Sequence, residues 1–210
     1  MSGSIILSGG GDSKQASDIN RFLYDQMKSK TSLSSLYIPL ALKEDYFDSA
    51  EQWFRSEHPY LEKITVVRNK QDAEKAMKKH YALIYIGGGN TGKLLYQLKE
   101  YSLDQYIITQ LSSGTIIYGG SAGAIVLGKT ITTAPEKEYE KDKDNRGLNL
   151  LGNYSIIPHF ESKFSKHHFN EAKKYGTKLL GISESSGVIF KGGKIVSEVN
   201  KKGINKFINY

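Results

Sequence analysis

Residues 118–128, YGGSAGAIVLG, carry the clearest chemical potential in this sequence. They place Ser121 at the centre of GGSAG (119–123), between an apolar stretch and a short helical stretch. This is the G-x-S-x-G pattern of a nucleophile elbow, where small neighbours let strand and helix approach and the turn projects the serine hydroxyl. The backbone N–H of Ala122, at the helix start, is suited to receive an oxyanion. The alternative is a glycine-rich turn in which Ser121 merely caps the helix.

A serine nucleophile needs a base, and the chain has five histidines. His159 ends the apolar run SIIPHF, at the edge where parallel sheets place active residues, and is the predicted base. The alternative for His159 is a structural, hydrogen-bonded side chain. His58 and His80 fall at the ends of expected helices, so we expect surface or capping roles for them.

The third member of a triad would be an acid that orients the imidazole. Between the serine and the histidine, the acids gather in the charged segment 135–146. They are Glu136, Glu138, Glu140, Asp142 and Asp144. Periodicity does not choose among them, and such a charge run is usually a solvated loop.

Residues 85–95, YIGGGNTGKLL, nearly match a phosphate-binding P-loop from Gly87 onward. A P-loop needs Ser or Thr after its lysine, because that hydroxyl holds the magnesium. Here Lys93 is followed by Leu94. Two interpretations follow: a non-catalytic nucleotide or phosphate binder using residues 87–93, or a glycine turn whose N–H groups serve another purpose.

The rest of the chain alternates strands with helices. Strands are expected at 4–8, 36–40, 64–67, 82–87, 115–119 and 154–160, and helices at 13–28, 45–57, 71–80, 91–101 and 103–112. This order predicts a single α/β domain, residues 1–210, with a mostly parallel sheet covered by helices on both faces. Residues 187–199 read as a β-hairpin around Lys191-Gly192-Gly193, forming an antiparallel edge or a small accessory sheet.

Composition narrows the function classes. The net charge is +7, but the lysines are scattered among acids along helices, so we expect no nucleic-acid partner. No apolar run reaches the roughly 20 residues of a membrane span, and the N-terminus lacks the pattern of a signal peptide. We expect a cytoplasmic protein, a monomer or homodimer, without a membrane partner.

Metal and cofactor chemistry find little support in the sequence. The chain has no cysteine, which excludes disulfides, thiolate zinc ligands and a thiol nucleophile. His167 and His168, with Glu171, supply too few ligands for a metal site. We expect no cofactor and no metal.

Together, GGSAGAIVLG, the upstream IGGGNT and the later IIPHF resemble the peptidase E (aspartyl dipeptidase) and cyanophycinase family of serine peptidases. The similarity runs from IILSGGG to GISESSGVIF. It implies a three-layer α/β sandwich similar to the class I glutamine amidotransferases, whose elbow nucleophile is cysteine. Because this chain has none, the serine branch is implied.

The resemblance also implies a Ser–acid–His triad, with Ser121 and His159 matching the family's serine and histidine. The family's acid falls on Glu136, where peptidase E has aspartate; Glu138 or Glu140 could take the role, and Glu184 is the next candidate. In this family the glycine turn supplies oxyanion-hole N–H groups, here those of Gly88 and Gly89, beside the N–H of Ala122.

The predicted function is a serine exopeptidase, similar to a dipeptidase, whose partner is a small peptide. Peptidase E favours an N-terminal aspartate held by basic groups after the histidine. That region offers lysines and histidines but no arginine, so strict aspartate selectivity is open, as are cyanophycin-type and isoaspartyl-type substrates. The candidate substrate-binding residues are Asn90, Lys163 and His168. A second enzyme alternative is an α/β-hydrolase-type esterase, which the glycine turn and the short chain disfavour.

Overall fold

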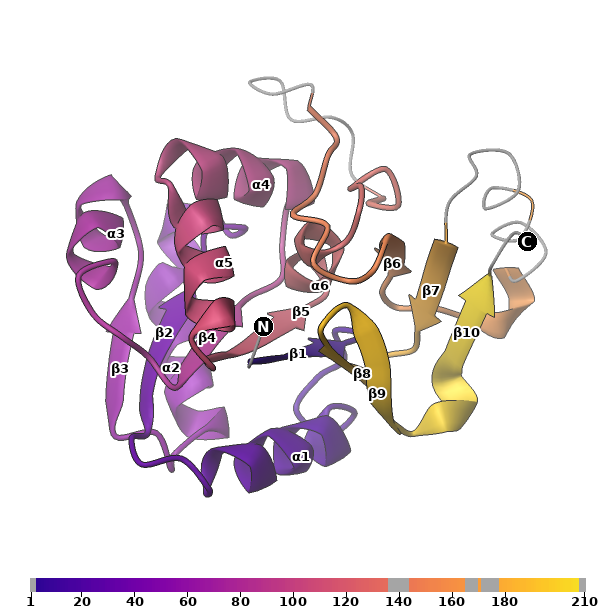
Figure 1. Cartoon of the computed structure of the whole chain (residues 1–210), viewed down its shortest axis with the longest axis horizontal. Helices are drawn as coiled ribbons and strands as arrows, with labels where there is room; N and C mark the ends of the chain where they lie inside the picture. Colours follow the sequence, from indigo (N-terminus) through magenta and orange to yellow (C-terminus); the bar gives the residue numbers. More distant parts are fainter. Residues whose placement is uncertain (1–2, 136–143, 165–169, 171–177, 208–210) are drawn as a thin grey trace.

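The computed structural model describes residues 3–135, 144–164, 170 and 178–207 of the chain. Its strands form two sheets (Figure 1). The larger sheet contains β1 (Ser4–Ser8), β2 (Ser34–Ile38), β3 (Lys63–Val66), β4 (Leu83–Ile86), β5 (Ile116–Gly120), β8 (Gly187–Lys191) and β9 (Lys194–Val199). The smaller sheet contains β6 (Tyr154–Ile157), β7 (Lys178–Ile182) and β10 (Ile204–Phe207).

The larger sheet is parallel except at one edge. Its order is β3-β2-β4-β5-β1-β8-β9, and β1 to β5 run parallel to one another. The hairpin β8–β9 adds antiparallel strands beside β1, which confirms the predicted antiparallel edge. In the smaller sheet, β6 is parallel and β10 antiparallel to the central β7.

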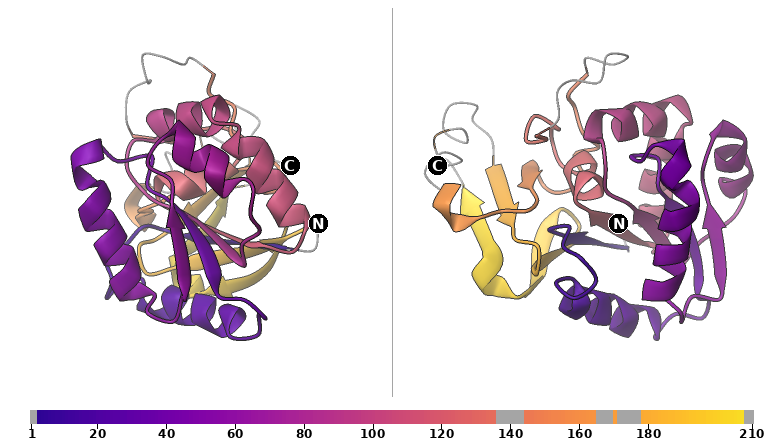
Figure 2. Two further views of the ribbon diagram at one scale, coloured as in Figure 1. Left: turned by 90° about the vertical axis from the view of Figure 1, so that its left-hand side faces the viewer. Right: turned by 180° about the vertical axis from the view of Figure 1, so that it is seen from behind.

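Helices cover both faces of the larger sheet, as Figures 1 and 2 show. They are α1 (Ser17–Met27), α2 (Phe47–Glu57), α3 (Lys70–Ala76), α4 (Thr91–Glu100), α5 (Leu103–Ser112) and α6 (Ala122–Leu127). Successive strand residues point to opposite faces. Ile5 therefore shares one core with Leu95 of α4, whereas Ile6 shares another with Leu23 of α1 and Phe54 of α2. The predicted α/β fold with a mostly parallel, two-sided sheet is confirmed.

Several predicted boundaries were wrong by a few residues. The first helix begins at Ser17 rather than residue 13, because Asp12 and Gln15 exchange side-chain and backbone hydrogen bonds that close a turn ahead of it. The third helix ends at Ala76, and the strand expected at 154–160 ends at Ile157. Strands β7 and β10 were not predicted.

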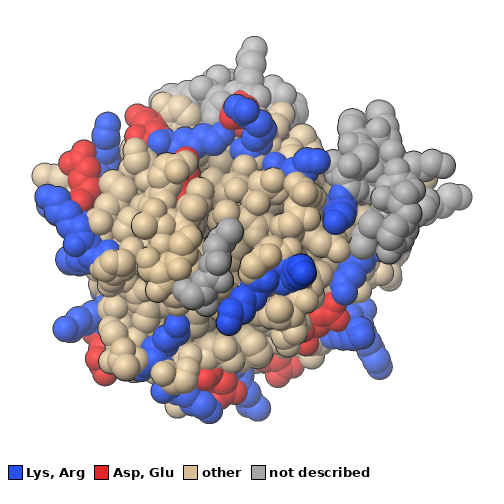
Figure 3. Space-filling model, in the orientation of Figure 1, with Lys and Arg blue, Asp and Glu red and all other residues tan. Residues whose placement is uncertain are grey.

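Charged side chains are mixed on the surface seen in Figure 3. On that face, basic and acidic groups alternate along the rim around a broad uncharged area. This mixing agrees with the scattered lysines of the sequence. None of the described helices is both long and apolar enough to cross a membrane.

Tight packing between β4, β5 and α6 explains the glycines of the elbow. A Cβ atom on Gly123 would lie 2.2 Å from the carbonyl oxygen of Ile86, and one on Gly119 would lie 2.7 Å from the carbonyl oxygen of Gly123. Real Cβ atoms do not approach backbone oxygens so closely. The helix can therefore sit against the strand ends only because both positions are glycine.

We expect Gly123→Ala to destabilise the fold by about 2 kcal/mol or more, because the strand carbonyl cannot yield to the added methyl group. For a chain of this size that loss lowers Tm by about 4–8 °C. Gly120→Ala is the matched control, since its nearest neighbour would be an ordinary contact at 3.7 Å. Equal Tm values for the two variants in thermal unfolding would contradict the packing argument.

Candidate active site

Three side chains form a continuous hydrogen-bonded chain at the carboxyl ends of the strands. Ser121 Oγ lies 3.0 Å from His159 Nε2. On the other side of the imidazole, His159 Nδ1 lies 2.9 Å from Glu184 Oε1. An ionised carboxylate only accepts hydrogen bonds, so Nδ1 carries the ring proton and Nε2 is left to accept from the serine hydroxyl. This is the arrangement of a nucleophile, a base and an orienting acid.

Both the serine and the histidine have an unusual backbone. Ser121 has φ 50° and ψ −113°, and His159 has φ 50°. A positive φ is uncommon outside glycine, and residues held in such conformations gather at functional sites. The turn at Ser121 is the strained strand-to-helix turn that the G-x-S-x-G pattern predicts, and its carbonyl accepts from the N–H groups of Ala124 and Ile125 in α6.

The three residues come from two sheets. Ser121 directly follows β5 of the larger sheet, while His159 and Glu184 each follow a strand of the smaller sheet, β6 and β7, by two residues. His159 therefore lies just beyond its strand, at the edge of the smaller sheet rather than of the larger one. The carboxyl ends of parallel strands meet at the same edge, which is where such residues gather.

Gly9, just after β1, holds the two sheets together at the site. Its N–H donates to the carbonyl of Ser186 (3.2 Å), and its own carbonyl accepts from the N–H of His159 (2.9 Å). A Cβ atom here would lie 2.0 Å from the carbonyl oxygen of Ser183. Only glycine allows the chain to pass this close to the loop that carries Glu184.

Gly10 continues this loop over the nucleophile. A Cβ atom on Gly10 would lie 2.7 Å from Ser121 Cβ and 2.8 Å from His159 Cε1, and its φ of +91° also favours glycine. The loop after β1 was not predicted to be part of the site. Its signal was present in the run GGG that follows the first strand.

Gln15 fixes the second oxygen of the acid. Its Nε2 lies 2.5 Å from Glu184 Oε2, while its Oε1 accepts from the backbone N–H of Asp12. The hydrogen bond from His159, followed by the one from Gln15, lowers the pKa of the Glu184 carboxyl below its ordinary value. The carboxylate therefore stays ionised and able to hold the imidazole.

Two backbone segments lie next to the serine, one at Gly88 and one at Ala122. The turn after β4 brings Gly88 close to the serine. A Cβ atom added to Gly88 would lie 3.2 Å from Ser121 Cβ and 3.7 Å from Ser121 Oγ. Ala122 is the first residue of α6, where N–H groups have no partner within the helix. Within the described part of the chain, neither N–H has an acceptor. Unpaired N–H groups beside a nucleophile are the donors from which an oxyanion hole can be built.

Comparison with known proteins identifies the family. The model of peptidase family S51 matches residues 4–197. This chain belongs to peptidase family S51.

Named relatives of this S51 protein agree with that assignment. Peptidase E of Actinobacillus pleuropneumoniae serotype 5b (strain L20) is 32% identical over 156 residues, which are 73% of this chain and 64% of that protein. Peptidase E of Haemophilus influenzae (strain PittGG) is 30% identical over 138 residues, 66% of this chain and 58% of its own length. The chain thus aligns with about three fifths of these curated relatives.

Solved structures share the fold. A protein of Listeria monocytogenes EGD-e named for peptidase E superposes with a TM-score of 0.70 at 20% identity, covering 92% of this chain and 96% of its own. A peptidase from an acI-B1 actinobacterium gives 0.69 at 26% identity, covering 91% and 84%. The first of these likenesses shows the fold alone.

The glycine turn of this S51 protein does not fit a phosphate site. Lys93 turns away from the loop, donates to the carbonyl of Leu42 and lies 5.9 Å from the centre of the Phe47 ring. Lys93 is half-buried, and burial lowers its pKa. Leu94 is fully buried in the core and Asn90 caps α4, accepting from the N–H of Lys93 at 2.7 Å.

Asp144 is the one predicted acid of the charged segment that the structure describes, and its partners are not His159. Glu136, Glu138, Glu140 and Asp142 lie outside the described residues. Asp144 pairs with Lys99 and with Arg146. The carboxylate at the imidazole is Glu184, the fallback candidate of the sequence analysis.

Glu184 was hard to identify because its strand was not predicted. The run KLLGI of β7 is short and follows a lysine-rich segment, so its carboxyl end was not recognised as a strand end. The usable signal was the acid that directly follows GIS. It places a carboxylate at the same sheet edge as His159.

The remaining candidates fall away from the nucleophile or outside the described chain. Lys163 forms an exposed ion pair with Glu161 (2.6 Å). His168 lies outside the described residues. Asn90 serves its helix, as described above.

His58 is a correction. The sequence predicted a surface or capping role, but the ring is 1% exposed and packs against Phe54 with ring centres 4.9 Å apart. Burial lowers its pKa to about 4, so it stays neutral. His80 is exposed, as expected, and its Nδ1 lies 3.0 Å from Gln110 Nε2.

We expect Gln15→Leu to raise the pKa of Glu184 toward its ordinary value, because one of the two donors that stabilise the carboxylate is removed. Because the pKa of Glu184 is lowered in the folded protein, its ionisation stabilises the fold at pH values above the pKa that it has in the unfolded chain. This stabilisation is lost as the pH falls through the pKa of the folded protein. In the variant this stabilisation is smaller, and its loss is complete at a higher pH. A carboxyl NMR titration measures the shift, with exposed Gln26→Leu as control; an unchanged Glu184 titration would show that Gln15 has no such role.

Proposed function

We propose that this protein is a serine-type peptidase of short peptides, similar to a dipeptidase, that uses Ser121, His159 and Glu184. The observation that carries the proposal is the unbroken chain from Ser121 Oγ to His159 (3.0 Å) and on to Glu184 (2.9 Å). Membership of family S51 supports the same chemistry. The acid here is Glu184, and the order along the chain is then Ser–His–Glu.

Acylation begins with attack on the scissile carbonyl. Ser121 Oγ forms a bond to the carbonyl carbon while its proton passes to His159 Nε2. The imidazole becomes positively charged, and the ionised Glu184 stabilises it through Nδ1–H. The tetrahedral intermediate collapses when His159 returns the proton to the leaving amine, which departs and leaves an acyl-serine.

Deacylation uses the same groups in the same order. A water molecule attacks the acyl carbon while His159 takes its proton, and the proton then returns to Ser121 Oγ as the acid product leaves. In both steps the negative charge on the carbonyl oxygen lies near the N–H groups of Gly88 and Ala122. Gly89 is the third proposed donor, and its φ of +131° makes glycine the favoured residue there.

The described residues give no support to the acidic preference expected from the resemblance. Lys163 is already paired with Glu161, and the described residues around Ser121 include no cation that lines the adjacent cavities. Support for peptide hydrolysis therefore comes from the geometry of the triad. Which substrate side chain the site prefers is a separate question.

Ser121→Ala tests the proposal. We expect the variant to fold normally and to lose roughly 10⁶-fold in kcat, because the nucleophile is gone and little volume changes. The measurement is a screen of wild type and variant against a dipeptide library, with circular dichroism to confirm the fold. Retention of a tenth of the wild-type rate would refute a covalent mechanism at Ser121.

The identity of the acid is tested by two matched substitutions. Glu184→Gln should lower kcat by about 10⁴-fold, as loss of the triad acid does elsewhere, because an amide does not stabilise the imidazolium. Glu136 is the acid implied by the family resemblance. We expect Glu136→Gln to leave kcat within about twofold of the wild-type value. The reverse result would return the role to Glu136.

A further inference from the structure

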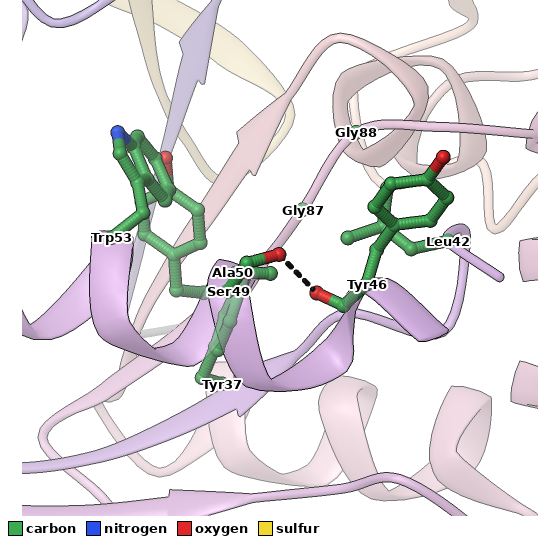
Figure 4. A pocket seen from close by; sticks show the side chains of 9 residues that line it. Tyr37, Leu42, Tyr46, Ser49, Ala50, Trp53, Gly87 and Gly88 are labelled. Carbon is green, nitrogen blue, oxygen red and sulfur yellow. Dashed lines mark hydrogen bonds between the residues drawn. The ribbon is translucent and has the colours of Figure 1, made fainter. Parts of the chain in front are cut away.

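An aromatic cavity opens beside the nucleophile. It has a volume of about 360 Å³ and lies between α2 and the turn after β4 (Figure 4). Its walls include Tyr37, Tyr46, Trp53 and Tyr85, and its rim includes Gly88. An apolar cavity of about 150 Å³ is large enough for benzene, so this one has room for an aromatic side chain.

The cavity is continuous with the serine. A smaller cavity of about 120 Å³ is lined by Ser121 and Gly10, and it shares Trp53, Tyr85 and Gly88 with the larger one. Gly88 is also one of the proposed oxyanion donors. If the scissile carbonyl oxygen binds at that N–H, the side chain of the same residue begins only two bonds from the carbonyl carbon, within reach of the wall that the two cavities share.

Two of the aromatic walls, Tyr37 and Tyr85, are buried and stack on other rings of the core. Tyr37 stacks on Phe54 at 4.5 Å, and Tyr85 stacks on Tyr118 at 4.3 Å. Trp53 donates its indole N–H to Ser13 Oγ at 3.3 Å.

Two of these walls leave apolar surface uncovered. Trp53 is 38% exposed and Tyr46 58% exposed, and both flank the opening in Figure 4. Large apolar surface left uncovered in a concave site marks a place for ligand binding.

Charge argues against an acidic occupant. None of the described residues that line either cavity is charged. Two charged groups contact residues that line the cavities, and both are engaged: the Lys93 ammonium donates to the backbone carbonyl of Leu42, and the Glu57 carboxylate accepts from Asn20 Nδ2 at 3.2 Å. Among the described lining residues, an aspartate side chain would lose hydration without gaining a cationic partner.

We propose that this cavity binds the side chain of the residue that contributes the scissile carbonyl, and that it selects an aromatic ring over a carboxylate. The inference rests on the proposed peptidase function for its kinetic part. Its binding part is independent of catalysis, because the cavity walls do not include the histidine or the acid.

Trp53 is the only tryptophan in the chain, which gives a direct binding readout. In the Ser121→Ala protein, titration with the dipeptide Phe-Ala should change the tryptophan fluorescence saturably, and Asp-Ala should bind at least about tenfold more weakly. The same titration of Ser121→Ala with Ala50→Leu should weaken Phe-Ala binding about tenfold, because the added side chain fills the cavity that Ala50 lines.

Kinetics supply the second arm. Wild type should cleave Phe-Ala with at least about tenfold higher kcat/KM than Asp-Ala. Ala50→Leu should lower the ratio of kcat/KM for Phe-Ala over Ala-Ala about tenfold. Gln52→Leu adds the same side chain at an exposed position of α2 outside both cavities and should leave that ratio unchanged.

The outcomes separate the two proposals. Saturable Phe-Ala binding to Ser121→Ala, without any turnover by wild type, would support the cavity and refute the peptidase. Cleavage of Asp-Ala in preference to Phe-Ala, or a tryptophan signal unmoved by Phe-Ala, would overturn the aromatic subsite and leave the peptidase standing. An equal effect of Gln52→Leu and Ala50→Leu would also overturn it.

Discussion

The site depends on two main-chain hydrogen bonds made by Gly9. Through them the loop after β1 holds the segment that carries His159 and the segment that carries Glu184 against the larger sheet. The serine would otherwise lie on one sheet and its base and acid on another. Because no side chain fits at Gly9, the backbone itself sets the spacing of the triad.

A second constraint is that one turn serves two purposes. The backbone at Gly88 faces the serine hydroxyl on one side and borders the aromatic cavity on the other. Stacked rings beneath, from Tyr37 to Tyr118, hold that turn in place through the core of the α1–α2 face. The position of the oxyanion donors and the shape of the cavity are therefore set by the same packing.

Much of this could be read from the residues. Strand and helix order, the elbow at Ser121 and the base at His159 followed from apolar runs and small-residue spacing, which are local signals. Glu184 did not, because its role depends on β7 pairing with β6, a contact between distant segments. Burial of His58 and the engagement of Lys93 were missed for the same reason: tertiary packing, rather than neighbouring sequence, decides where a helix-end side chain points.

Among the described residues, the smaller sheet has a small apolar core of its own. One of its faces contributes Ile156 and Leu180 to the main core, and the described cluster on the other face is Ile157, Phe160, Leu179 and Phe207. Regions with few buried contacts open locally at a lower free energy than the whole fold. The proposed base and acid both follow strands of this sheet, so we expect its local opening on warming to separate them from Ser121 while the larger sheet is still intact.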